Sequence, residues 1–279
     1  MLGSHDVNPM DAGRRAGATS RADGATRWRV WAPPASRVDL VPVDGSTRRV
    51  HPMSGGEAGD FSVRLPDIVE GQRYAYRLDG SAERPDPCSL WQPDGVHAPS
   101  AVVRPETFAW RDGRWGGVPR RHLVFYELHG GTFTPDGTFE AIIPRLPALR
   151  ELGVTALELM PIAQFPGARN WGYDGTFLYA AQASYGGPRG LQRLVDACHA
   201  AGLAIVLDVV YNHFGPEGNY LGEFGPYLTD HHQTPWGAAV NCDGPGPDAV
   251  RAFVLDNVRM WLEEFHLDGL RLDAVHAIY

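Results

Sequence analysis

The sequence predicts an α/β protein in which a small immunoglobulin-like β-sandwich precedes about the first four strands of a (β/α)8 barrel. Between residues 24 and 103, apolar residues recur with a period near two, and Gly, Pro and Asp separate the runs. From residue 122 onward, short apolar runs alternate four times with helical patterns, which is typical of a parallel sheet. The chain of 279 residues is long enough for two such domains.

The predicted sandwich has a flanking segment on each side. Residues 1–23 are rich in Gly, Ala, Arg, Asp and Ser, and we expect them to form a disordered tail because they offer little to bury. Residues 104–121 contain several turn-forming residues and are predicted to be a linker. The expected sandwich strands are residues 28–31, 38–41, 61–65 and 74–78.

The barrel part, residues 122–279, is expected to alternate strands and helices. The third predicted strand is almost wholly apolar, as a strand covered on both faces should be. Pro144 and Pro147 interrupt the first predicted helix, whereas the helix that starts near Asp248 has a clear apolar stripe. The expected strands are residues 122–128, 154–160, 203–210 and 267–272.

Composition narrows the possible partners. A net charge of −8 argues against nucleic acid and anionic membranes as partners, and it suits a neutral, polyhydroxylated substrate. Three widely spaced cysteines favour neither a disulfide framework nor a zinc site, and they suggest a reducing cytoplasm. The chain has no long apolar run and no apolar signal core, so we expect no transmembrane helix and no secretion.

Polar side chains cluster after the predicted strands, on the side where barrels bind their ligands. Taken singly, a strand-end Asp is more often a helix cap or half of a structural ion pair, and His213 is more often a buried polar histidine. Together they make a plausible sugar site, because an Arg near a carboxylate nucleophile favours its ionised form. The candidates are Tyr173 after the second strand, Asp208 and His213 at the third, and Arg271, Asp273 and His276 at the fourth.

These clusters resemble the α-amylase superfamily of glycoside hydrolases. Residues 208–213 (DVVYNH) look like the first hallmark of that family, and residues 269–273 (GLRLD) look like its second. The segment Trp31-Ala32-Pro33 resembles the β-sandwich module that precedes the barrel in several members. A finer resemblance is to the maltooligosyltrehalose trehalohydrolases, which hydrolyse the α-1,4 bond next to a terminal trehalose. It rests on residues 127–129, 172–175, 212–221, 234–237 and 273–278.

The resemblance implies roles for the three residues of the expected ion-pair network. Asp273 would be the nucleophile that forms a covalent glycosyl-enzyme, as in retaining glycosidases. Arg271 would orient Asp273 and keep it ionised, and Asp208 would brace Arg271.

Three further residues would contact the substrate, which is implied to be maltooligosyl trehalose or a related α-glucan. His213 would hydrogen-bond the sugar in the cleavage subsite, Tyr173 would stack beneath it, and His276 would contact the next sugar. No cofactor and no metal ion are expected, although Asn212 lies where some amylases bind calcium.

Two features of the family are expected to be missing from these residues. Its general acid is a Glu after the fifth barrel strand, and a further Asp follows the seventh, so we interpret the chain as a truncated front portion. Since a general acid contributes about 10²–10⁴-fold, we expect this chain alone to hydrolyse nothing above background. An α-glucan branching or debranching enzyme is a second interpretation, and a non-catalytic glucan-binding protein is a third.

Overall fold

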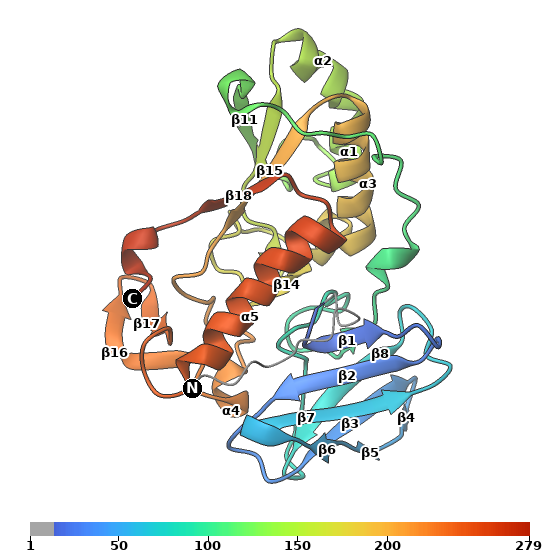
Figure 1. Cartoon of the computed structure of the whole chain (residues 1–279), viewed down its shortest axis with the longest axis vertical. Helices are drawn as coiled ribbons and strands as arrows, with labels where there is room; N and C mark the ends of the chain where they lie inside the picture. The colour runs from blue at the N-terminus through green and yellow to red at the C-terminus, as the bar shows by residue number, and fades with distance from the viewer. Residues whose placement is uncertain (1–13) are drawn as a thin grey trace, which may run out of the picture.

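The computed structural model describes residues 14–279, which form a β-sandwich at one end and a partial α/β barrel at the other (Figure 1). Ion pairs connect the two parts: Arg189 binds Glu70 at 2.6 Å, and Arg84 binds Glu223 at 2.8 Å. The Arg84 guanidinium also lies 4.4 Å from the centre of the Tyr220 ring. The sandwich is therefore fastened to the barrel by side chains of both parts.

The sandwich consists of two antiparallel sheets around buried aromatic residues. Trp28, Tyr74 and Tyr76 are among its most deeply buried side chains, and Trp28 packs edge-on against Tyr74. The alternation predicted from the sequence is confirmed, because Trp28 and Val30 face the core while Arg27 and Arg29 do not. One sheet has the order β1 (Gly17–Ser20), β2 (Thr26–Trp31), β7 (Asp60–Leu65), β6 (Ser54–Gly55). The other has the order β10 (Ser100–Ala101), β8 (Arg73–Leu78), β3 (Val38–Asp44), β4 (Thr47–Arg48), with β5 (His51–Pro52) on β3 and β9 (Glu83–Arg84) on β8.

The expected disordered tail is wrong for its last part. Strand β1 lies inside residues 1–23 and pairs antiparallel with β2. Backbone pairing holds this Gly-Ala-Thr-Ser strand, and its one apolar side chain in the core is the small Ala18, which is why its composition gave no signal. Arg14 also stabilises the strand by donating hydrogen bonds to the carbonyl oxygens of Ala16 and Ala18. Residues 1–13 lie outside the described residues.

The barrel part is built on four parallel strands in chain order, as the sequence predicts. They are β11 (Phe125–Leu128), β12 (Ala156–Leu159), β15 (Ala204–Val209) and β18 (Gly269–Leu272). Strands β11 and β18 are the two edges of this sheet, and Phe125 and Leu272 on them are each 49% exposed. The carboxyl ends of all four strands point to one side of the sheet, which brings their polar residues together.

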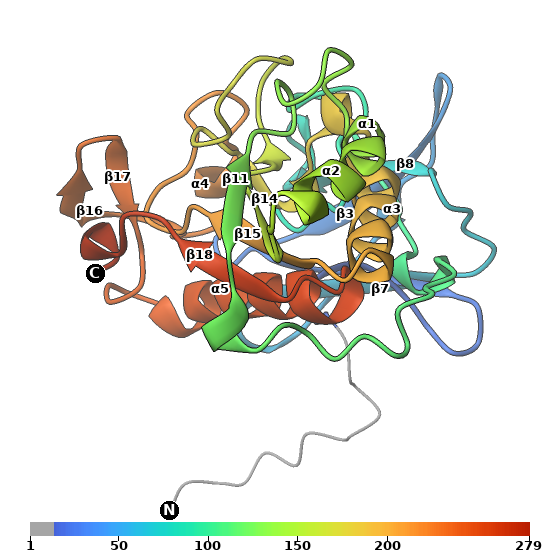
Figure 2. The same ribbon diagram turned by 90° about the horizontal axis from the view of Figure 1, so that it is seen from above.

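Helices cover the outer face of this sheet, as the view in Figure 2 shows for α3 and α5. The predicted first helix is broken where prolines occur, into α1 (Phe139–Ile142), the 3-10 turn η5 (Ile143–Arg145) and α2 (Leu146–Glu151). Helix α3 (Gly187–Ala200) precedes β15. Helix α5 (Pro247–Arg259) follows the predicted apolar stripe and continues as a π-helical turn, η7 (Met260–Glu264).

Several short elements were not predicted. The loop after β12 contains β13 (Ala163–Gln164), β14 (Phe177–Ala181) and the 3-10 turn η6 (Ala183–Tyr185). The loop after β15 contains α4 (Leu221–Phe224) and the hairpin β16 (Leu228–Thr234) and β17 (Gly237–Val240). Strand β14 is buried at every position and β16 is mostly polar, so neither shows an alternating pattern. The remaining 3-10 turns are η2 (Glu57–Gly59), η3 (Pro105–Thr107), η4 (Arg120–His122) and η8 (Val275–Ala277).

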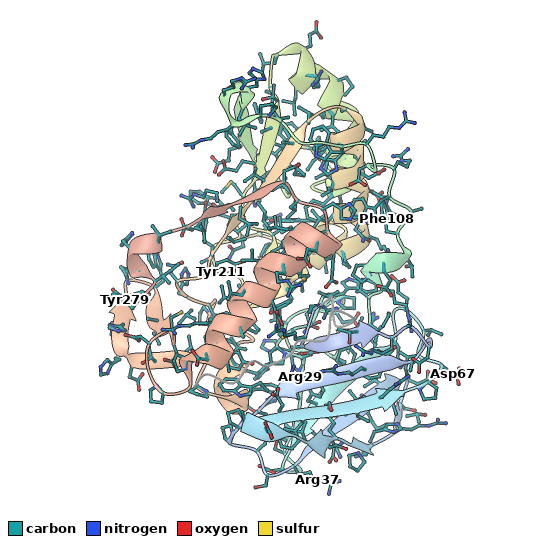
Figure 3. All side chains as sticks on the ribbon, viewed as in Figure 1. Arg29, Arg37, Asp67, Phe108, Tyr211 and Tyr279 are labelled. Carbon is teal, nitrogen blue, oxygen red and sulfur yellow. The ribbon has the colours of Figure 1, made fainter. Side chains whose placement is uncertain are left out.

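Tyr211 and Tyr279, both labelled in Figure 3, anchor the loop after β15. Tyr211 lies against α5, where its hydroxyl donates a 2.6 Å hydrogen bond to Asn257 Oδ1. Tyr279 stacks on His232 of the β16–β17 hairpin with ring centres 4.2 Å apart.

Cys88, Cys198 and Cys242 are free thiols. Within residues 14–279, no helix has the length and apolar character needed to span a bilayer.

The predicted linker is fixed to the barrel by a buried histidine. His199 of α3 contacts Asp112 of the linker at 3.0 Å through Nδ1 and Asp268 at 3.0 Å through Nε2. Trp115 stacks on His199 and donates to Asp268 at 2.7 Å, while His266 also contacts Asp112 at 2.7 Å. Burial lowers the pKa of His199, but the two carboxylates outweigh burial and raise it above its usual value. His199 therefore bridges two carboxylates as an imidazolium.

We expect His199→Gln to destabilise the chain in a pH-dependent way. Because the folded state raises the pKa of His199, the imidazolium stabilises fully below the ordinary value of 6.5 and loses this effect as pH rises through the folded-state pKa. The urea midpoint should fall by the equivalent of about 1–3 kcal/mol near pH 6 and by less near pH 9. His122→Gln, at an exposed position, is the matched control. A constant difference between wild type and His199→Gln across this range would contradict the bridging role.

Candidate active site

Asp208, Arg271 and Asp273 form one hydrogen-bonded network at the carboxyl ends of the two last strands. Asp208 and Arg271 are direct partners in the β15–β18 register, and Arg271 and Asp273 share a strand face because they are two residues apart. Arg271 Nη1 donates to both carboxylate oxygens of Asp208 at 2.9 Å and to Asp273 Oδ1 at 2.6 Å. One guanidinium nitrogen therefore bridges a buried carboxylate and a partly exposed one.

Tyr173 completes the network from the loop after β12. Its hydroxyl donates to Asp208 Oδ2 at 3.0 Å, the oxygen that also accepts from Arg271. Burial, followed by the charge of Asp208, raises the pKa of Tyr173, so the phenol stays protonated and remains a donor. Burial also raises the pKa of Asp208, and the hydrogen bonds from Arg271 and Tyr173 oppose that shift.

His213 lies beside this network, and its ring nitrogens are not engaged by other described side chains. It is 4% exposed, and within residues 14–279 neither ring nitrogen makes a hydrogen bond of good geometry, although a backbone contact with Tyr173 opposes the effect of burial on its pKa. Its ring stacks on Trp236 of the β16–β17 turn, with ring centres 5.2 Å apart and planes 19° from parallel. Burial lowers the pKa of His213, so it is a neutral imidazole at neutral pH. A buried polar ring whose nitrogens lack well-formed hydrogen bonds is costly, so this ring is suited to a ligand.

Two other sequence candidates have less defined surroundings. His276 lies in η8, three residues after Asp273, and is exposed. Ala274 between them has a φ of 41°, in the left-handed region, which turns the chain away from the strand. Asn212 is fully buried, and its amide atoms have no partner among the described residues.

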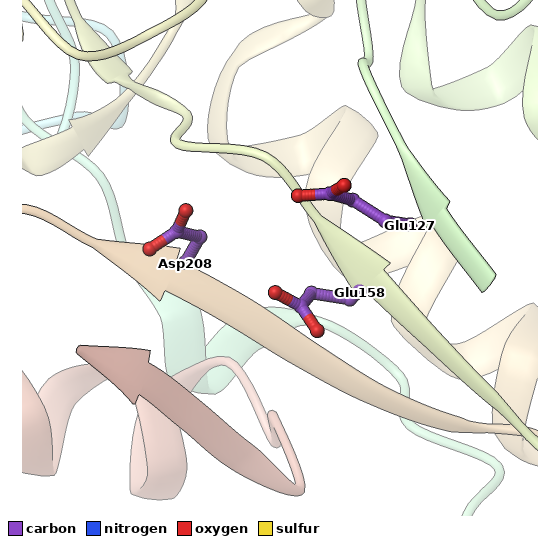
Figure 4. Close-up of side chains that lie close together, drawn as sticks. All are labelled: Glu127, Glu158 and Asp208. Atoms are coloured by element: carbon purple, nitrogen blue, oxygen red, sulfur yellow. The ribbon is translucent and has the colours of Figure 1, made fainter. Parts of the chain in front are cut away.

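An acidic cluster that the sequence did not reveal lies next to Asp208. Glu127 and Glu158 are register partners on β11 and β12, and with Asp208 they bring one carboxylate oxygen each within 4.8 Å of one another (Figure 4). Burial, then the charges of Glu127 and Asp208, raise the pKa of Glu158. Among residues 14–279 this is the one group of three or more acidic, His or Cys side chains close enough to share a cation, and Asn212 is not part of it. The patterns Tyr-Glu-Leu and Leu-Glu-Leu place each Glu inside an apolar run, but they do not show that the two strands pair in this register.

A sandwich that leads into parallel strands with this carboxylate–arginine network defines the front part of a carbohydrate-active barrel protein. Family models agree: residues 15–90 match carbohydrate-binding module 48 (isoamylase N-terminal domain), and residues 102–234 match the alpha amylase catalytic domain. The chain therefore belongs to the α-amylase family, with a module 48 followed by part of the catalytic domain.

Individual relatives in the same family resemble this chain over most of its length. A malto-oligosyltrehalose trehalohydrolase from Saccharolobus solfataricus is 52% identical over 92% of this chain, and one from Arthrobacter ramosus is 49% identical over 90%. A 1,4-alpha-glucan branching enzyme from Rhodospirillum rubrum is 34% identical over 96%. The chain spans 45%, 44% and 40% of the lengths of these relatives.

Solved structures show the same architecture. A protein from Salmonella typhimurium, provisionally named an alpha amylase, superimposes with a TM-score of 0.89 at 42% identity, covering 95% of this chain and 44% of its own. A pullulanase from Anoxybacillus sp. LM18-11, solved with maltotetraose, gives 0.82 at 24% identity, covering 95% of this chain and 46% of its own. The second likeness concerns the fold alone.

We expect Arg271→Met to destabilise the chain through Asp208. The substitution leaves Asp208, which is 1% exposed, with Tyr173 as its remaining side-chain partner. Loss of the buried carboxylate's main partner should cost about 1–3 kcal/mol, measured as a shift in the urea midpoint at pH 7. Arg259→Met is the matched control, because its ion pair with Glu263 is exposed and should contribute about 0–1 kcal/mol. Equal shifts for the two variants would contradict the bridging role of Arg271.

Proposed function

We propose that the protein is a retaining α-glycoside hydrolase that cleaves the α-1,4 bond next to the terminal trehalose of maltooligosyl trehalose and releases trehalose. The observation that supports this most directly is the Arg271 bridge between Asp208 and Asp273. The names of the relatives that are 42–52% identical support the trehalose-releasing reaction.

In this proposal Asp273 is the nucleophile. A carboxylate oxygen of Asp273 attacks the anomeric carbon, the bond to the leaving trehalose breaks, and a covalent glycosyl-enzyme forms. Arg271 holds Asp273 in place through a 2.6 Å hydrogen bond to Oδ1, and Asp208 fixes Arg271. Water then hydrolyses the intermediate with retention of configuration.

The residues around Asp273 would bind the sugar in the cleavage subsite. The neutral His213 is suited to hydrogen-bond a sugar hydroxyl, and Tyr173 offers its ring face beneath the sugar. His276, exposed after Asp273, would contact the next sugar. The general acid that protonates the leaving oxygen is, in the family that the sequence resembles, a Glu after the fifth barrel strand, and the four strands here precede that position.

A branching enzyme is the second candidate, because a relative with that name is 34% identical over 96% of the chain. A non-catalytic glucan-binding protein is the third, and it would use the same sugar-facing residues without turnover. Expression of the protein from its complete reading frame separates the three. We expect free trehalose from maltooligosyl trehalose; new branch points or debranching of plain α-glucan would favour the second, and binding without turnover the third.

We expect Asp273→Asn in the protein from the complete reading frame to reduce trehalose release by about 10³-fold or more, because an amide is a poor nucleophile. Binding of the substrate, measured by calorimetry, should be retained. Asp248→Asn is the control, since the Asp248 side chain is 94% exposed on α5. Turnover like that of the wild type in Asp273→Asn would remove Asp273 from the mechanism.

A further inference from the structure

His129, directly after β11, is held by three polar contacts that are not explained by packing alone. Its Nδ1 lies 2.9 Å from Thr132 Oγ1, and its Nε2 lies 2.8 Å from the backbone oxygen of Asn170. The hydroxyl of Tyr185 lies 2.9 Å from Nε2 and 3.3 Å from the same Asn170 oxygen. These contacts join the end of the first barrel strand to the loop that follows the second.

The contact with the Asn170 carbonyl defines the role of Nε2. A carbonyl oxygen only accepts, so Nε2 carries the proton and donates it to Asn170. Nδ1 shares a hydrogen bond with the Thr132 hydroxyl, which can donate or accept, and the Tyr185 hydroxyl donates to the Asn170 carbonyl beside Nε2. Tyr185 also packs edge-on against His129, with ring centres 5.7 Å apart. The ring is therefore fixed in orientation by contacts at both of its nitrogens.

The side chain of Asn170 hydrogen-bonds to the loop that carries Tyr173. Its Oδ1 accepts from the backbone N–H of Gly172 at 2.7 Å, and its Nδ2 donates to Asp174 Oδ2 at 2.9 Å. Gly172 has a φ of 100°, and a Cβ there would lie 2.0 Å from the carbonyl oxygen of Pro161. Residues 170–174 thus form a turn whose backbone and side chains are both fixed.

We propose that His129 is a positioning residue for the active site: by holding Asn170, it keeps the 170–174 turn where the Tyr173 hydroxyl reaches Asp208. The Tyr173 hydrogen bond of 3.0 Å supports the same carboxylate that fixes Arg271. This inference rests on the proposed function for its effect on catalysis, but its effect on the turn is independent of any activity. Misplacement of a site by about 1 Å is enough to cost roughly 100-fold in rate.

Two substitutions at one position separate a hydrogen bond from simple packing. In His129→Gln, the amide nitrogen occupies about the place of Nε2 and still donates to Asn170. In His129→Asn, the shorter side chain places its amide near Nδ1, so it reaches towards Thr132 but not Asn170. His129→Gln is therefore the conservative variant that should keep the hydrogen bond to Asn170, and His129→Asn is the matched variant that should lose it.

The first readout is hydrogen–deuterium exchange of residues 170–175 in the 279-residue chain, measured by mass spectrometry. We expect exchange of this turn to accelerate by about tenfold in His129→Asn, as befits loss of one hydrogen bond, and to stay within about twofold of wild type in His129→Gln. Exchange within α5 should not change in either variant. Equal exchange of the turn in wild type and His129→Asn, or equal acceleration in the Gln and Asn variants, would overturn the proposal.

The second readout is turnover of the protein from the complete reading frame. His129→Asn should lower kcat for trehalose release by about 10–100-fold with little change in KM, and His129→Gln should restore most of it. If the wild type releases no trehalose, the proposed function fails while the exchange experiment still tests the positioning role. If His129→Asn does not fold, Tyr185→Phe keeps the ring and removes the hydroxyl, and exchange of the turn should rise about threefold; no rise there would overturn the proposal.

Discussion

The site depends on the burial of one carboxylate, Asp208, between a cation and a phenol. A buried carboxylate is costly unless it is hydrogen-bonded, and here Arg271 and Tyr173 supply those bonds from two different segments. Satisfying Asp208 therefore fixes both segments. The same Arg271 nitrogen holds Asp273, so the position of the proposed nucleophile follows from the requirement to pair Asp208.

The supporting structure can be followed outward from this network. Tyr173 is held by a turn that Asn170 closes and that His129 fixes from the neighbouring strand. On the opposite end of the sheet, His199 joins the linker to the segment before β18 through Asp112 and Asp268. The strand that carries Arg271 is thus anchored at its start by a charged contact and at its end by the site itself.

Much of this arrangement could be predicted from the sequence, because strong periodic patterns determined it. The apolar runs that became β12 and β15 and the stripe of α5 gave the parallel order, and that order brought Asp208, Arg271 and Asp273 together. Strand β1 could not be predicted, because it is held mainly by backbone pairing with β2 and places only the small Ala18 in the core. The same holds for the polar strand β16, which pairs with β17 through its backbone.

Details of the site that depend on strand register and loop geometry could also not be predicted from the sequence. Glu127 and Glu158 meet because they are register partners, and His129 meets Asn170 across a loop. No spacing in the chain encodes either contact.

The central claim is that Asp273 is the nucleophile. It is tested most directly by trapping the protein from its complete reading frame with an activated 5-fluoro-α-glucosyl fluoride and locating the adduct by peptide mass spectrometry. The account predicts a glycosyl adduct on Asp273, because a retaining nucleophile forms a covalent intermediate. An adduct on another carboxylate, or product of inverted configuration with no adduct, would contradict it.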